Sequence, residues 1–391
     1  MGLYWGGMPR FVQNKQSPYK KIVLKTTDDK NLIVRFDNKD DYIEYVNNAK
    51  SLPKSDTISR EDISIITKQT ITPKTKSIWY PFKSHWGAIR HKYINPIGVE
   101  QPNTRYPIYV VTKGRWFNML TLRELNLMKQ KHFAIVEAQE LEQYQKALND
   151  KGFNYTELLI LPQKYLDEYD TCDDLGDAKS KGPGSARNFC IDHSKNHKRH
   201  WVLDDNLDAF HYFTDNEKCE LETNATFRAC EDFVDRFKNV PVSGMNYYSF
   251  CKSTDFAQPY KLNTRIYSCL LIENSSGYRW RGRYNEDTDL SLRVLKDGLC
   301  TIQFNAFLCG KLTTQRMRGG NSTDFYDEDG TLPKSQMLVD LHPDVSEVVW
   351  KFNRWHHKVN YTLFKKNRLI PIDDFDIVKH NDYGLTKVPS K

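Results

Sequence analysis

Two clusters of acidic residues carry the side chains best suited to chemistry in this sequence. Asp204-Asp205-Asn206 directly follows the apolar run Trp201–Leu203, and Asn285-Glu286-Asp287-Thr288-Asp289 comes about 80 residues later. Adjacent carboxylates repel one another unless a cation is bound, and carboxylate and amide oxygens are the ligands that hard divalent ions prefer. The first cluster therefore predicts a site for Mn²⁺ or Mg²⁺ that holds a diphosphate. The alternative is a polar turn after a core strand.

The second cluster begins a predicted helix that runs from Glu286 to Asp297. The helix dipole stabilises a carboxylate in the first turn. Either Glu286 or Asp287, if it faces a pocket, can accept a proton from a hydroxyl group. The alternative is ordinary helix capping, with Asp289 and Arg293 forming an i,i+4 ion pair on the surface. We expect the surface pair for Asp289, whereas capping and catalysis are compatible for Glu286 and Asp287.

The elements that must position these clusters alternate between strand and helix patterns from residue 106 onward. Strands are expected at 108–112, 133–137, 157–161, 200–203, 265–273 and 300–304, and helices at 121–131, 138–150, 185–198 and 223–238. This alternation predicts an α/β fold with a Rossmann-like, mixed and mainly parallel sheet flanked by helices. Ligands of such sheets bind beyond the carboxyl ends of the strands, which is where Asp204-Asp205-Asn206 is expected.

The 391 residues divide into three predicted segments: an N-terminal accessory module (1–104), the α/β domain (105–312) and a basic C-terminal extension (313–391) that completes the site. The accessory module begins with a predicted hairpin of 21–26 and 31–36. In the α/β domain, a capping box from Thr121 to Glu124 is expected to start helix 121–131. The extension contains a predicted helix, 343–357.

Two stretches, 69–99 and 348–372, contain no acidic residue and interleave basic with aromatic residues. Such a pattern is typical of nucleic-acid grooves, where cations contact phosphates and rings contact bases. The alternative is a domain edge packed by its aromatic side chains, with solvated lysines. The net charge of +7 permits a polyanionic partner without requiring one.

The composition also indicates the compartment. The chain has no run of about 18 apolar residues and no signal-peptide pattern, so no membrane segment is expected. Its eight cysteines are scattered between Cys172 and Cys309 without CxxC pairs, which favours free thiols in a reducing cytoplasm. A zinc site is a weaker alternative, because His193 and His197 are spaced i,i+4 near Cys190 and His200.

The motifs together resemble those of GT-A-type glycosyltransferases. A strand that ends in Asp-Asp-Asn is followed by Glu-Asp-x-Asp-Leu-x-x-Arg at 286–293, and Ala186-Arg187-Asn188 matches an Ala-Arg-Asn segment common in that family. The similarity covers roughly residues 105–312. The run Trp280–Leu290 most resembles the glycosyltransferases encoded beside TET-type DNA hydroxylases in bacteriophages, and segments 4–9 and 75–81 are also similar to phage sequences.

The resemblance implies a role for individual residues. Asp204 would bind the ribose or the metal, Asp205 and Asn206 the metal and diphosphate, and Asp287 would be the favoured base, with Glu286 next. Arg187 would approach the diphosphate. The nucleotide base and ribose would be framed by residues at the ends of the first two strands, namely Thr112, Lys113, Arg115 and Glu137. A further metal ligand, common in the family, stays open among His342, His356 and His357, and a closing loop with Arg316 or Arg318 is an alternative.

The function implied is metal-dependent transfer of a sugar from a nucleotide-sugar, expected to be a UDP-sugar, to a hydroxyl group. The expected acceptor is 5-hydroxymethylpyrimidine, above all 5-hydroxymethylcytosine, in double-stranded DNA, with inversion at the sugar. The enzyme would then be phage-encoded and act in the bacterial host cytoplasm. Two alternatives remain at this point: a glycosyltransferase with a protein or glycan acceptor, and a non-catalytic DNA-binding protein that retains the fold.

Overall fold

The structure is a computed structural model. It describes residues 21–36, 39–49, 57–67, 69, 71–80, 91–95, 103–176, 180–214, 217–251, 258–311, 331–373 and 383–389. Segment 4–9, Arg316 and Arg318 lie outside these residues, as does part of the basic stretch 69–99. The chain forms two compact units, one over residues 12–90 and one that includes residues 91–389.

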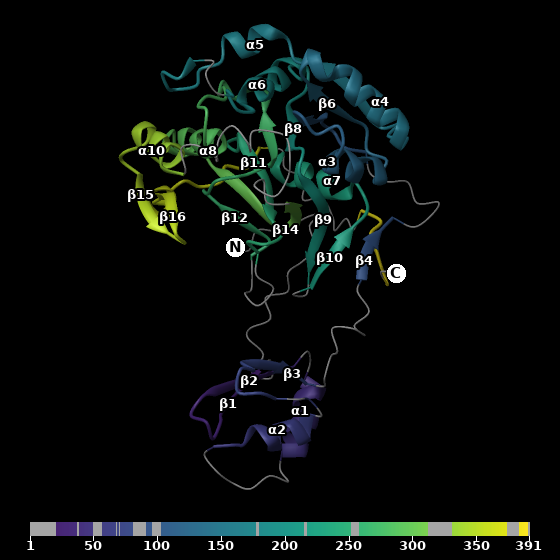
Figure 1. Ribbon diagram of the computed structural model, residues 1–391, viewed down its shortest axis with the longest axis vertical. Helices are drawn as coiled ribbons and strands as arrows, with labels where there is room; N and C mark the ends of the chain where they lie inside the picture. The colour runs from purple at the N-terminus through teal and green to yellow at the C-terminus, as the bar shows by residue number, and fades with distance from the viewer. Residues whose placement is uncertain are drawn as a thin grey trace. The chain divides into compact units, whose positions relative to one another are not determined.

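The described residues of the smaller unit form a three-stranded sheet with two helices (Figure 1). Its elements are β1 (Lys21–Lys25), β2 (Asn31–Arg35), α1 (Lys39–Ala49), α2 (Arg60–Thr67) and β3 (Ser77–Trp79). β1 and β2 are antiparallel, which confirms the predicted hairpin, and β3 pairs with β2 in parallel. Alternate residues of β2, Leu32 and Val34, are fully buried with Tyr45 and Ile63 from the helices, so the unit has a core of its own.

The larger unit is built on one mixed sheet that is flanked by helices. Its strands are β4 (His91–Ile94), β5 (Ile108–Val111), β6 (His132–Val136), β7 (Thr156–Ile160), β8 (Arg199–Asp204), β9 (Leu207–Thr214), β10 (Glu217–Leu221), β11 (Val242–Tyr247), β12 (Tyr260–Leu262), β13 (Cys269–Glu273), β14 (Thr301–Lys311) and β17 (Thr386–Pro389). Its main helices are α3 (Leu120–Leu127), α4 (Leu141–Lys151), α5 (Gln163–Asp167), α6 (Gly184–His193), α7 (Ala225–Val234), α8 (Glu286–Lys296) and α10 (Leu332–Leu341).

The strand order is β17-β4-β10-β9-β14-β11-β13-β8-β5-β6-β7, and β12 pairs with β14. Pairing is parallel from β8 through β5 and β6 to β7, and again at β11–β14 and β4–β10; the other pairs are antiparallel. The predicted mixed α/β sheet is therefore confirmed. The parallel run contains the predicted βαβ units, while β9 to β12 were not assigned as strands from the sequence.

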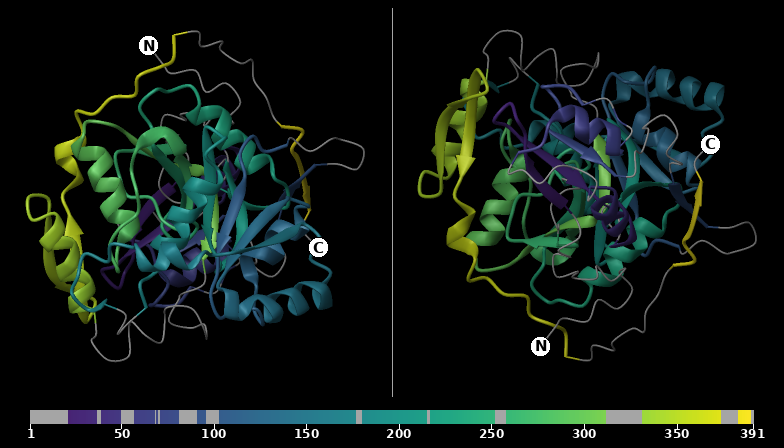
Figure 2. Two further views of the ribbon diagram at one scale, coloured as in Figure 1. Left: turned by 90° about the horizontal axis from the view of Figure 1, so that it is seen from above. Right: turned by 90° about the horizontal axis from the view of Figure 1, so that it is seen from below.

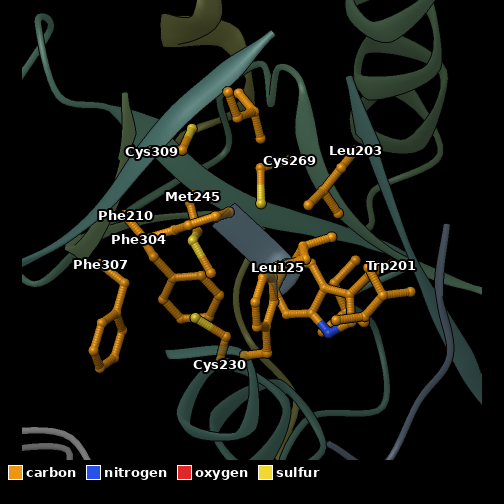
Figure 3. Close-up of a cluster of buried hydrophobic side chains, with 14 of the residues drawn as sticks. Leu125, Trp201, Leu203, Phe210, Cys230, Met245, Cys269, Phe304, Phe307 and Cys309 are labelled. Carbon is orange, nitrogen blue, oxygen red and sulfur yellow. The ribbon is translucent and has the colours of Figure 1, made fainter. Parts of the chain in front are cut away.

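Helices cover both faces of this sheet because side chains alternate along each strand. Along β5, Ile108 and Val110 join a core with α3, α4 and α7, whereas Tyr109 joins a second core with α6 and α8. In the first core, Trp201 and Leu203 of β8 lie in one group with Leu125, Phe304 and the cysteines Cys230, Cys269 and Cys309 (Figure 3). All eight cysteines of the chain are free thiols, as expected.

Two local predictions were wrong. The predicted helix 343–357 is instead a hairpin of β15 (Ser346–Lys351) and β16 (Arg354–Val359). Its turn residues Phe352 and Asn353 both have positive φ, as a type I′ turn requires, but Phe-Asn lacks the glycine that usually marks this turn in a sequence. The capping box is also absent. Met119 is the N-cap of α3, and the Thr121 hydroxyl bonds to the backbone of the acidic turn instead.

The C-terminal strand β17 is antiparallel to β4, and the two lie side by side in both views of Figure 2. β4 in turn pairs with β10, so strands from both ends of the described part of this unit complete one edge of the sheet. The structure thus places β4 and β17 in the same sheet as the strands of the α/β domain. Among the described residues, no helix has the length and apolar character that a membrane crossing requires.

Candidate active site

The first acidic cluster lies at the carboxyl end of β8, between β5 and β13 in the sheet. The carboxylate of Asp204 is held through both oxygens. Oδ1 accepts a hydrogen bond from Arg187 Nη2 at 2.7 Å, and Oδ2 accepts from Ser268 Oγ at 2.6 Å and from Lys311 Nζ at 2.8 Å. Burial alone raises the pKa of this carboxyl, but the positive charges of Lys311 and Arg187 outweigh burial and hold the pKa well below its usual value.

Asp205 faces a different set of partners, at the end of β5. Its carboxylate accepts a hydrogen bond from Thr112 Oγ1 at 2.9 Å and forms an ion pair with Arg115. The hydroxyl of Tyr144, from α4, bonds to Thr112 Oγ1 at 2.7 Å and accepts from the Arg115 backbone N–H at 3.1 Å. Burial raises the pKa of Asp205 despite Arg115. Asn206, also buried, completes the turn.

α3 holds this turn from the side. The Thr121 hydroxyl donates to the Asp204 carbonyl oxygen at 2.6 Å and accepts from the Leu207 N–H at 2.9 Å. Thr121 is fully buried, so both bonds are shielded from water. The backbone on either side of Asp205 and Asn206 is therefore fixed by one side chain of a neighbouring helix.

Arg187 joins the two acidic clusters into one site. While Nη2 bonds to Asp204, Nη1 donates to Glu286 Oε1 at 3.0 Å, and the guanidinium lies 4.6 Å from the centre of the Trp280 ring. The Arg187 side chain is 2% exposed, as expected of a cation paired on two sides. Clusters that are about 80 residues apart in the sequence are thus brought together, across α6 and the start of α8.

Asp287 is the carboxylate at the start of α8 that has no cation bonded to it among the described residues. Its Oδ1 accepts only from Thr288, through the backbone N–H at 2.7 Å and the hydroxyl at 3.4 Å. Burial, together with the adjacent negative charge of Glu286, raises the pKa of Asp287 to about 7. A carboxylate whose pKa lies near neutral pH is suited to act as a general base.

A group of polar and aromatic side chains surrounds Asp287. The charges of Arg187 and Lys334 oppose the rise in its pKa. Burial raises the pKa of Tyr267 and of Tyr361, and the negative charge of Asp287 adds to this rise. Arg265 lies 5.1 Å from the centre of the Tyr267 ring. These residues come from the segment before β13, from α10 and from the segment after β16, so the C-terminal part of the chain contributes to this side of the site.

The remaining predicted nucleotide residues lie at the ends of β5 and β6. Lys113 Nζ forms an ion pair with Glu137 Oε1 at 2.7 Å, and the Gly114 N–H donates to Glu140 Oε2 at 3.0 Å. Gly114 has a φ of 65°, which a turn directly after a strand requires. Lys113 and Glu137 thus border the same end of the sheet as Asp205.

Sequence reasoning did not find Lys311, Ser268 or Tyr247. Lys311 Nζ donates to Asp204 Oδ2, to Ser268 Oγ at 2.5 Å and to Tyr247 OH at 3.2 Å. Burial lowers the pKa of Lys311, but Asp204 outweighs it and raises the pKa above its usual value. The signal in the sequence was slight: Lys311 is the first charged residue after the apolar run of β14.

Asp289 pairs with Arg293 at 2.8 Å, the expected i,i+4 pair, but it is fully buried rather than on the surface. It also accepts from Arg281 and from His342 Nε2 at 2.9 Å. His342 is therefore bonded to Asp289, and His356 accepts from Arg354 at 3.1 Å. Burial, with the charges of Lys334 and Arg265, lowers the pKa of the third candidate, His357, to about 4.

The zinc alternative has no support in the structure. α6 ends at His193, so His197 does not share a helix face with it, and His193 bonds to the Tyr109 hydroxyl at 2.8 Å. His200 bonds to Asn274. Within the described parts of the chain, no group of three or more His, Cys, Asp or Glu side chains is placed to hold a metal ion.

A groove of about 970 Å³ lies where the hairpin β15–β16 meets the rest of the unit. Its cationic lining residues are Lys261, Lys358, Lys365 and Arg368, against two acidic ones, Asp344 and Glu347. Tyr361, which also neighbours Asp287, lines the groove as well. The groove thus connects a basic surface with the side of the site on which Asp287 lies.

Residues 106–320, more than half of the chain, match the TET-associated glycosyltransferase family. The chain belongs to this family. The predicted family and the predicted glycosyltransferase activity are thereby confirmed. A solved structure of GalNAc-T7 with UDP, GalNAc and Mn²⁺ is also similar, at 9% identity and a TM-score of 0.33, over 55% of this chain and 45% of that one. The chain thus spans less than half of that protein's length, and no curated protein sequence matches it.

Proposed function

We propose that this TET-associated glycosyltransferase moves a sugar from a UDP-sugar to the hydroxyl of 5-hydroxymethylpyrimidine in double-stranded DNA, with 5-hydroxymethylcytosine as the preferred acceptor. The observation that carries the proposal is the link from Asp204 through Arg187 to Glu286 and Asp287. This link supports the proposal because Asp287, whose pKa is near neutral, follows Glu286 directly and Glu286 is tied to a cation-rich strand end, in a chain of this family.

The donor is assigned to the ends of β5, β6 and β8, where nucleotides bind in open α/β sheets. Thr112, Lys113, Arg115 and Glu137 would border the uracil and ribose, and Asp205 and Asn206 would position the nucleotide with them. Asp204 would orient the diphosphate through Arg187, whose guanidinium is suited to phosphate oxygens.

A divalent ion was expected at Asp204, Asp205 and Asn206, and Mn²⁺ is present in the GalNAc-T7 structure. The side chains as they stand do not fit such an ion. Both oxygens of Asp204 are engaged by Arg187, Ser268 and Lys311, and Asp205 bonds to Thr112 and Arg115 on another side. We therefore assign no step to a metal ion.

In the proposed reaction, Asp287 removes the proton from the acceptor hydroxymethyl group as its oxygen attacks C1 of the sugar. The bond between C1 and the diphosphate oxygen breaks, and the electron pair leaves with UDP. Direct displacement inverts the configuration at C1. Glu286 keeps its charge paired with Arg187 and raises the Asp287 pKa, so it supports the base rather than replacing it.

The acceptor side is assigned to the basic groove and the hairpin β15–β16. Lys358 and Lys365 line the groove, and the hairpin carries the exposed side chains of Trp350, Phe352 and Trp355. Cations bind DNA phosphates and aromatic rings contact bases. The 5-hydroxymethyl group projects into the major groove, so it can be reached with little or no base flipping. Such an acceptor is consistent with a phage enzyme in the bacterial cytoplasm.

The test is nucleoside mass spectrometry. DNA duplexes containing 5-hydroxymethylcytosine, 5-hydroxymethyluracil or only unmodified bases are incubated with the protein and a panel of nucleotide-sugars. The expected result is a hexose adduct on the hydroxymethylated nucleoside with one donor and none on unmodified DNA. Transfer to proteins or free glycans, with none to any hydroxymethylated duplex, would refute the DNA acceptor.

A further inference from the structure

Lys311 is directed at Asp204 by the local structure of β14. The pairing between β14 and β9 shifts register between Gly310 and Lys311, as at a β-bulge. Bulges re-aim the side chains beside them and are common next to active sites. Gly310 is also confined, because a Cβ at this position would lie 2.3 Å from Asp208 Oδ1. The strand end that presents Lys311 is therefore specifically shaped.

The acceptors around the Lys311 ammonium match its three N–H donors. They are Asp204 Oδ2, Ser268 Oγ and Tyr247 OH, and the latter two bond to each other at 2.5 Å. Ser268 has a φ of 57°, a strained conformation for a residue other than glycine, and its carbonyl accepts from the Asp204 N–H at 2.8 Å. Strain of this kind is typical of functional sites.

The ammonium group occupies the place that a metal ion would need. A divalent ion binds carboxylate oxygens directly, at about 2.0–2.6 Å. Asp204 Oδ2 already accepts from Lys311 and Ser268, and Oδ1 from Arg187. An ion at Oδ2 would have to displace the Lys311 ammonium or lie against it, and like charges at that separation repel strongly in a buried site.

Arg187 adds a donor for a ligand. Its Nε is buried and has no hydrogen-bond acceptor among the described residues, although the Nη atoms are paired with Asp204 and Glu286. A buried N–H without an acceptor is costly unless a ligand supplies one. Phosphate oxygens accept from both guanidinium and ammonium groups.

We infer that the Lys311 ammonium is the cation that this site uses at Asp204. With Arg187 it takes the role for which a divalent ion was expected, so nucleoside diphosphate binding needs no metal. The inference rests on the proposed function for the identity of the ligand. Lys311 compensates the charge of Asp204 in the free enzyme and that of the leaving diphosphate during transfer.

The first experiment compares UDP, GDP and ADP binding by calorimetry in EDTA and in Mn²⁺. Wild-type protein is expected to bind UDP with the same affinity, within about twofold, in both conditions. Electron paramagnetic resonance of Mn²⁺ with the protein alone gives a readout that does not depend on any nucleotide. We expect the wild type to bind no Mn²⁺ through Asp204, so the Asp204→Asn substitution should not change the spectrum.

Removing the ammonium should create the metal site. In Lys311→Ala, nucleotide affinity in EDTA should fall about 10- to 100-fold, as for the loss of a hydrogen bond to a charged group. Mn²⁺ should restore it and should now bind to the protein alone. Lys311→Arg should stay insensitive to EDTA. Lys296→Ala is the matched control, since Lys296 pairs with Asp344 at 2.6 Å outside the site.

The outcomes separate the two proposals. UDP binding or transfer that requires Mn²⁺ in the wild type, or Mn²⁺ bound by wild type and lost in Asp204→Asn, would overturn the role of Lys311 and leave the glycosyltransferase proposal intact. If no nucleoside diphosphate binds in either condition, the donor assignment fails, and the Mn²⁺ measurement on wild type and Lys311→Ala still decides the role of Lys311. A misfolded Lys311→Ala is recognised by its melting curve, and Lys311→Met, which removes the ammonium but keeps the length of the side chain, then replaces it.

Discussion

At the scale of single residues, Asp287 is the group on which the proposed chemistry depends most directly. We expect Asp287→Asn to lower kcat about 10²- to 10⁴-fold, because the amide cannot take up the proton of the hydroxyl group that receives the sugar. Donor affinity should change little, since Asp287 lies on the acceptor side. In the wild type, kcat/KM should rise with pH up to about 7 and then level off, as the carboxyl loses its proton. Steady-state kinetics of both proteins across pH checks this.

The matched control is Asp289→Asn, because Asp289 is buried on the same helix but paired with Arg281, Arg293 and His342. That variant should lose stability rather than show a shifted pH profile. Near-normal turnover by Asp287→Asn would show that another residue is the general base, and Glu286 would be the first candidate.

The same titration affects stability. Folding raises the Asp287 pKa from its usual 3.8 to about 7, so the folded chain holds this proton more tightly than the unfolded chain. The stability that the proton contributes is therefore lost as pH rises through this range. The Tm of Asp287→Asn minus the Tm of wild type should therefore be larger at pH 8 than at pH 5. A constant difference in Tm at both pH values would contradict the raised pKa.

Residue types at a strand end predicted Asp204, Asp205 and Asn206 as site residues. In the structure Arg187 links Asp204 to Glu286, whereas Asp205 pairs with Thr112 and Arg115. Lys311 could not be predicted in this way. Its contact with Asp204 depends on a register shift between β14 and β9, which are joined by long-range pairing that no local pattern reveals. For the same reason the sequence did not reveal that Lys311 and Arg187 pair with Asp204.

At the scale of elements, α3 supports the acidic turn through Thr121. Thr121→Val keeps the shape but removes the hydroxyl that bonds to Asp204 and Leu207. Leaving the buried Leu207 N–H without its acceptor should cost about 1–3 kcal/mol of unfolding free energy. Urea denaturation measures this loss, and UDP affinity should fall with it as the turn loosens.

Thr121→Ser is the control, because it keeps the hydroxyl and loses only a methyl group. It should retain most of the UDP affinity that Thr121→Val loses. Equal affinity in the two variants would show that the turn does not need this support. The threonine itself was identified from the sequence, but as a helix cap, since only tertiary packing reveals that its partner is a neighbouring strand end.

The hairpin β15–β16 and the following segment form the element proposed to bind DNA. Replacing Lys358, Lys365 and Lys366 together by Glu should weaken DNA binding and lower the salt dependence by about 0.9 in slope per lost phosphate contact. Donor hydrolysis should be unchanged, because the side-chain partners of Asp204 are Arg187, Ser268 and Lys311 rather than these three lysines. Binding of a hydroxymethylated duplex at several salt concentrations measures both effects.

In the matched control, Lys146, Lys151 and Lys164 are replaced by Glu. These lysines are exposed on α4 and α5, so the net charge changes by the same amount at another place on the surface. If DNA affinity falls equally in both variants, the change in net charge alone explains the loss, and the hairpin is not part of the DNA interface. The basic and aromatic composition of 348–372 was apparent from the sequence. Its secondary structure was not, because the two-residue turn at Phe352 and Asn353 has no glycine to mark it.

At the scale of the whole molecule, the unit boundaries follow from strand pairing rather than from composition. The three predicted segments placed the start of the α/β domain at residue 105, where the alternating pattern begins. In the structure β4 (His91–Ile94) lies between β10 and β17 in the large sheet. Sequence patterns identify single strands, but an edge that joins residues from distant parts of the chain has no local signature.

A pair of truncations tests this boundary. The smaller unit has its own sheet and core, so a fragment of residues 91–391 should fold and bind UDP. A fragment of residues 105–391 lacks β4, and the unpaired backbone of β10 and β17 should then be exposed at a sheet edge, which promotes aggregation. We expect the shorter fragment to have a lower Tm and to elute partly as aggregate in size-exclusion chromatography. Equal Tm and monodispersity of the two fragments would show that β4 is dispensable and would restore residue 105 as the boundary. A fragment 91–391 that fails to fold would instead show that the larger unit depends on residues before His91.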